Sequence, residues 1–218
     1  RYLDRLRESE RTDANRGTPK FGLLPPSISH EGYSAKPAYS HWDNFWGLIG
    51  YRSAITLADQ LGRADDAKRL AASRDTFRAD ILASLDASAK RFAIDFIPGA
   101  ADLGDFDATS TTIALSPGGE REHLPPARLE ATFERYWREL VDRRDGRRDW
   151  KDYTPYEWRN VSAFIRLGWR ERAHEAIDYF FGDRRPEGWN QWAEVVGREY
   201  REPRFIGDIF FLGTAIVK

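Results

Sequence analysis

Apolar residues recur with the period of an α-helix over much of this chain. In residues 42–61 one set follows the spacing i, i+3, i+4, i+7 and marks one helix face: Trp42, Phe45, Trp46 and Ile49. A second set gives the segment another apolar face: Leu48, Tyr51 and Ile55. A helix that is apolar on two sides is expected to pack between neighbours. Gly62 is expected to end it, because glycine accepts the left-handed conformation that follows many helices.

The remaining periodic segments are of two kinds. Residues 64–88, 126–144 and 170–182 each carry one apolar stripe with charged residues elsewhere, as expected for outer helices. Residues 107–115 and 155–167 carry few charges, as expected for buried helices. Buried and outer helices therefore alternate along the chain. We predict an all-α fold class built from helical hairpins.

The alternation favours a closed ring of inner helices wrapped by outer helices, an (α/α)6 toroid. Such a ring usually has six hairpins, so we expect an incomplete, C-terminal part with about three to four of them. Further helices are expected at 1–12 and after residue 205. We predict a single domain over 1–218, which the upstream half of the same polypeptide would complete. The chain has no Met, which also suggests a piece of a longer protein.

Four long connections lack helical period: 17–41, 89–106, 116–126 and 183–204. Long loops without regular structure are commonly functional or disordered. These contain Tyr, Trp, Phe and His, so we predict ordered loops that line a cleft.

The amino-acid composition disfavours or excludes several classes of function. The 34 basic and 35 acidic side chains nearly cancel, which disfavours a nucleic-acid partner. No apolar run is long enough to predict a membrane span. The absence of Cys excludes disulfides and thiolate chemistry, and none of the four His has metal-ligand spacing. We expect no cofactor and no metal, although Asp105 and Asp107 form a weak acidic pair.

Carboxylates lie beside aromatic residues at the starts of the predicted inner helices. The acidic residues are Asp43, Asp107, Glu157 and Glu194, beside Trp42, Phe106, Trp158 and Trp192. Aromatic faces stack on sugar rings, carboxylates accept hydrogen bonds from sugar hydroxyls, and glycosidic cleavage needs two carboxyl groups. Ordinary structural roles stay open: helix caps for Asp43 and Asp107, a first-turn acid for Glu157, and a buried ion pair for Glu194.

Taken in order, the segments WD, DATSTTIAL, YEWR, WAEVV and RFIGD resemble the glucoamylase-like branch of the six-hairpin glycosidases. The resemblance implies an (α/α)6 toroid and hydrolysis with inversion. It implies that Asp43 binds sugar hydroxyls, that Glu157 is the general acid and that Glu194 is the general base. Glu157 precedes its Trp, whereas the family's acid follows one.

The substrate-binding residues expected with this catalytic pair come from four segments: Glu31, His41, Trp42, Asp43, Asp107, Trp158, Arg159, Trp189 and Trp192. The expected partner is an oligo- or polysaccharide. The resemblance slightly favours a periplasmic or extracellular location.

Two other functions stay open from the sequence. One is a non-catalytic glycan-binding or scaffolding domain, whose acids only cap helices. The other is a polysaccharide lyase on a similar toroid, which needs a Tyr or His base and positive charge for an acidic sugar. The lyase would use Tyr33, Tyr39, His41 and Arg159.

Overall fold

The computed structural model describes residues 2–28, 36–149, 152–184, 192 and 196–197. The fold class is all-α, as predicted. The α-helices are α1 (Tyr2–Ser9), α2 (His41–Gln60), α3 (Ala64–Phe92), α4 (Ala108–Leu115), α5 (Pro126–Arg144), α6 (Arg159–Leu167) and α7 (Arg170–Gly182). Two 3-10 helices, η1 (Arg121–His123) and η2 (Pro155–Trp158), and one antiparallel pair of two-residue strands, β1 (Asp152–Tyr153) and β2 (Val196–Gly197), complete the described elements.

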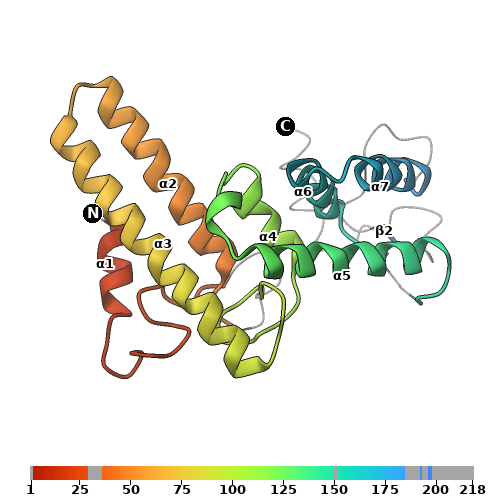
Figure 1. Ribbon diagram of the computed structural model, residues 1–218, viewed down its shortest axis with the longest axis horizontal. Helices are drawn as coiled ribbons and strands as arrows, with labels where there is room; N and C mark the ends of the chain where they lie inside the picture. Colours follow the sequence, from red (N-terminus) through yellow and green to blue (C-terminus); the bar gives the residue numbers. More distant parts are fainter. Residues whose placement is uncertain (1, 29–35, 150–151, 185–191, 193–195, 198–218) are drawn as a thin grey trace, which may run out of the picture. The chain divides into compact units, whose positions relative to one another are not determined.

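The chain divides into two compact units, Arg1–Glu134 and Arg135–Lys218. The first unit is built on the hairpin of α2 and α3, which lie side by side in Figure 1. Its core includes Phe45 and Leu48 from α2 and Phe77, Ile81 and Leu85 from α3, all at most 2% exposed. The predicted helix end at Gly62 is confirmed, since this residue has a φ of +67°.

Helix α1 is fixed to α3 by a buried cation. The Arg7 guanidinium donates to Asp80 at 2.8 Å and to the backbone oxygens of Ser73 and Gly22. It also lies over the Phe77 ring, 4.5 Å from its centroid. Arg11 donates to the same Asp80 carboxylate. An eight-residue helix is marginal by itself in water, so these contacts position α1.

The loop after α1 passes close to this ion pair. Gly22 has a φ of +71°, and a Cβ built there would lie 2.5 Å from an Asp80 carboxylate oxygen. Any side chain would both strain the backbone and displace that carboxylate. Glycine at this position therefore lets the loop cross the buried ion pair.

Two short bridges order the connections around the start of α2. Ser27 and Ala38 exchange backbone hydrogen bonds at 3.0 and 3.1 Å, and Ser40 pairs with Ala100. The His41 amide donates to the Gly99 oxygen at 2.8 Å. The beginning of α2 is thus tied to two of the long connections.

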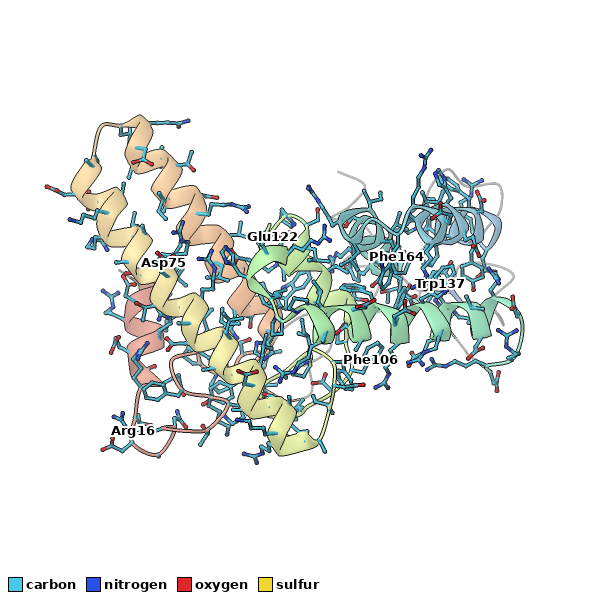
Figure 2. All side chains as sticks on the ribbon, in the orientation of Figure 1. Arg16, Asp75, Phe106, Glu122, Trp137 and Phe164 are labelled. Atoms are coloured by element: carbon cyan, nitrogen blue, oxygen red, sulfur yellow. The ribbon has the colours of Figure 1, made fainter. Side chains whose placement is uncertain are left out.

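The second unit contains the hairpin of α6 and α7, packed with the end of α5. Phe164 of α6 is fully buried, and its ring lies 5.7 Å from that of Trp137 on α5; both are labelled in Figure 2. Phe180 of α7 is also fully buried and lies beside Tyr153 and Trp158. Aromatic packing therefore dominates this core.

The expectation that both apolar faces of α2 would be covered is wrong at Trp46, which is 41% exposed. Trp42, Phe45, Leu48 and Tyr51 are buried, and α2 contacts both α3 and α4. The sequence pattern identified apolar positions correctly, but periodicity alone does not indicate whether a neighbour covers each face.

We predict that Arg7→Met lowers the free energy of unfolding by about 2 kcal/mol, because it removes the more buried of the two arginines that pair with Asp80, whose carboxylate is 12% exposed and keeps Arg11. The matched control Arg16→Met removes an exposed pair with Asp13 and should cost less than about 1 kcal/mol. Urea unfolding measures both, and equal effects would contradict this role of Arg7.

Candidate functional site

The first unit carries an open groove with a volume of about 590 Å³. Three elements line it. Helix α1 contributes Leu3 and Leu6, the connection contributes residues 24–28, and α2 contributes Asp43, Trp46 and Gly47. The groove therefore depends on the position of α1, which the Arg7–Asp80 pair fixes.

Asp43 is the charged residue among the described residues of this lining. It lies in the first turn of α2, is half-buried, and accepts a hydrogen bond from the Ser27 hydroxyl. In the part of the chain that the structure describes, this carboxylate has no other hydrogen-bond donor and no ion pair. Ser40 occupies the N-cap position, and Asp43 makes no capping hydrogen bond to it or to the first helix amides among these residues.

The loop that holds Ser27 is positioned by a buried amide. Asn44 is fully buried; its side-chain oxygen accepts from the Leu24 amide at 3.0 Å, and its nitrogen donates to the Ser40 oxygen at 2.8 Å. The Ser27–Ala38 bridge then fixes the other end of the segment. The backbone of 24–28 is thereby held beside Asp43.

The aromatic face of the groove comes from Trp46. Its side chain is 41% exposed, whereas Trp42 is 7% exposed and packs edge-on behind it, with ring centroids 5.9 Å apart. The sequence predicted Trp42 as the sugar-binding residue and placed Trp46 on a buried face. In the structure Trp46 lines the groove, and Trp42 supports it. The i, i+4 spacing was a signal that the two rings would meet.

His41 is close in sequence to the groove but inaccessible. Its imidazole is fully buried, stacks on Phe45 at 6.0 Å, and has no hydrogen-bond partner on either ring nitrogen among the described residues. Burial lowers the pKa of His41 to about 4. A direct substrate contact by His41 is therefore not available in this conformation.

Asp107 is a helix cap, one of the two roles that the sequence left open. Its carboxylate accepts from the Ser110 amide at 3.0 Å and from the Ser110 hydroxyl. Asp105 accepts from the Ala100 amide at 2.9 Å, which orders the loop before α4.

Glu157 is engaged in a bidentate ion pair in the second unit. Arg143 donates to its two carboxylate oxygens at 3.0 and 2.5 Å, and the Tyr136 hydroxyl donates at 2.7 Å. Burial and the Glu157 charge raise the pKa of the Tyr136 hydroxyl. A general acid must present a carboxyl oxygen to the leaving group, whereas both Glu157 oxygens here are hydrogen-bonded to Arg143.

Two of the aromatic residues predicted as sugar contacts in this unit, Trp158 and Trp192, lie together. Trp158 lies 5.0 Å from Trp192 and 5.2 Å from Phe181, and the Trp192 indole donates to the Phe180 oxygen at 3.3 Å. Arg159 lies over the Tyr156 ring at 4.5 Å. The chain positions Glu157, Trp158 and Arg159 consecutively across the junction of η2 and α6.

Three predicted site residues, Glu31, Trp189 and Glu194, lie outside the described residues. The roles of Glu31 and Trp189 as sugar contacts and of Glu194 as the general base stay predictions. Within the described ranges, no group of three or more His, Asp or Glu residues is placed to hold a metal ion.

Comparison of the chain with protein-family models, curated proteins and solved structures gave no match. None of the helices in the described ranges has the length and apolar character needed to cross a bilayer. The family resemblance therefore depends on the sequence motifs alone.

We predict that stability falls as the pH falls from about 6.5 to about 4, because the unfolded chain takes up a proton at His41 before the folded chain does. His41→Phe should flatten this part of the pH–stability curve. His123→Phe, which replaces an exposed imidazole in the same unit, is the control and should leave the curve unchanged. Thermal unfolding at several pH values measures both; an unaltered curve for His41→Phe would contradict the assignment.

We predict that Glu157→Gln lowers the free energy of unfolding by about 2 kcal/mol, because it leaves the buried Arg143 charge without a carboxylate. Glu175→Gln is the matched control: its pair with Arg144 is exposed, and its loss should cost less than about 1 kcal/mol. Denaturant unfolding distinguishes the two, and a stable Glu157→Gln variant would show that the ion pair is dispensable.

Proposed function

We propose that this chain binds a glycan in the groove at the start of α2, as part of a glycoside hydrolase. The observation that carries the proposal is the juxtaposition of Asp43 and the exposed indole of Trp46 in one groove. Helical hairpins such as α2–α3 and α6–α7 are the units from which an (α/α)6 toroid is built. We propose that these hairpins belong to such a toroid.

The groove offers a partner to the apolar C–H face of a pyranose ring and another to its hydroxyl groups. The C–H face of a sugar ring is apolar and stacks on an aromatic ring, here Trp46. The ring hydroxyls need acceptors, which the Asp43 carboxylate supplies on its side of the groove. Pro25, Pro26 and Leu24 add apolar walls that exclude water from these contacts. An open groove admits a chain of several sugar units.

For the chemical step we propose inversion, with Glu194 as the general base and Glu157 as the general acid, as the family resemblance implies. The Arg143–Glu157 pair favours a second candidate, a glycan-binding domain without turnover. Proton donation by Glu157 would require this ion pair to open or Arg143 to move when substrate binds.

The binding test is titration with cellohexaose and maltohexaose, followed by tryptophan fluorescence and calorimetry. Trp46→Ala and Asp43→Asn should each weaken binding about tenfold or more, the effect of losing one stacking or charge-assisted contact of about 1.4 kcal/mol. Leu57→Ala and Asp59→Asn replace exposed residues farther along α2 and should leave binding unchanged.

Two results would contradict glycan binding in this groove. One is the absence of binding to a broad panel of neutral, basic and acidic oligosaccharides. The other is binding that survives both groove substitutions while circular dichroism shows the variants folded.

Release of new reducing ends from bound oligosaccharides separates the two candidates. A hydrolase should lose turnover by orders of magnitude in Glu194→Gln and in Glu157→Gln, with binding retained. Turnover that persists in both variants would refute the assigned catalytic pair. Binding without any turnover by the unaltered chain would favour the non-catalytic candidate.

A further inference from the structure

We infer that the groove at the start of α2 selects glycans that carry a free amino group, such as glucosamine oligomers, over neutral and acidic glycans; this inference rests on the proposed function. Among the described residues that line the groove, Asp43 alone is charged, and the other lining residues are apolar or carry a hydroxyl. The described part of the lining therefore presents one negative charge among neutral residues.

The Asp43 carboxylate forms no ion pair among the described residues. Its hydrogen-bond partner there is the neutral Ser27 hydroxyl, and it is half-buried against proline, leucine and tryptophan. Burying a carboxylate beside apolar groups costs free energy unless an opposite charge compensates it. Elsewhere in this unit such compensation is provided by arginine, as at Asp80 and at Glu120. A ligand ammonium would supply the compensating positive charge at Asp43 that Arg7 supplies at Asp80.

Trp46 strengthens the same preference. An indole face attracts a cation as well as a sugar C–H face, and the effect grows when water is excluded. An amino sugar stacked on this ring brings its ammonium near both the indole and the carboxylate. A uronic acid or a sulfated sugar would instead bring a second negative charge to Asp43, which is unfavourable at short range.

The test compares three tetrasaccharides that differ in charge: fully deacetylated chitotetraose, its N-acetylated form, and tetragalacturonate. At a pH of about 6 the amines are protonated and the carboxylates ionised. Calorimetry should show the deacetylated form binding about tenfold more tightly than the acetylated form, equivalent to about 1.4 kcal/mol. Tetragalacturonate should bind most weakly, and added salt should reduce the differences.

Asp43→Asn is the decisive variant, because it keeps the shape of the side chain and an oxygen for the Ser27 hydroxyl while removing the charge. It should bring the deacetylated and acetylated forms to equal affinity. Asp59→Asn, an exposed carboxylate at the far end of α2, should retain the tenfold preference. Circular dichroism confirms that both variants are folded.

The outcomes distinguish this inference from the proposed function. Equal binding of the charged and uncharged sugars by the unaltered chain overturns the inference and leaves glycan binding in place. Binding of none of the sugars overturns both. Tetramethylammonium that competes as well as glucosamine oligomers also overturns the inference, since the groove would then recognise a cation and not an amino sugar.

Discussion

The buried ion pair between Arg7 and Asp80 is the interaction on which the candidate site depends. Its guanidinium ties an eight-residue helix to the middle of α3, and the loop that follows crosses the pair at Gly22, where no side chain fits. Because Leu3 and Leu6 of that helix form one wall of the groove, the groove exists only where this pair places α1. Removing Arg7 would leave the buried Asp80 carboxylate to the more exposed Arg11, so the pair both stabilises the unit and fixes the position of α1.

Two of the acidic residues identified in the sequence, Asp43 and Glu157, have opposite environments in the structure. Glu157 accepts three hydrogen bonds from Arg143 and Tyr136 inside its unit. Asp43 receives one from a neutral hydroxyl and faces an open groove. A carboxylate whose hydrogen-bond partners lie within the protein stabilises the fold. A carboxylate that faces solvent beside an exposed indole is available to bind a ligand. This contrast is why the proposed glycan site is centred on Asp43, while the catalytic role of Glu157 stays a prediction.

Helical periodicity was sufficient to predict the all-α class and most helix positions, because apolar stripes and a glycine at Gly62 are local signals. The capping role of Asp107 was among the interpretations that the sequence left open, because capping is also a local signal.

The residues of the candidate site were harder to predict from the sequence than the helices were. Trp42 and Trp46 share a helix face, and the sequence pattern does not show that the first is buried and the second exposed. Nothing in the local sequence marks Ser27 or Asn44 as part of the site. Each acts through a hydrogen bond to a distant residue: Ser27 with Asp43, and Asn44 with Leu24. Arg143 lies at the end of the predicted helix 126–144, and its pairing with Glu157 is a tertiary contact that the local sequence does not indicate.

The most direct test of the account is a crystal structure of the chain with a bound glucosamine tetrasaccharide. The account predicts one sugar ring stacked on the indole of Trp46, with an amino or hydroxyl group within hydrogen-bond distance of the Asp43 carboxylate and the Ser27 hydroxyl still in place. A sugar bound instead at the Trp158–Trp192 cluster, with the groove of Leu3, Asp43 and Trp46 empty, would contradict it.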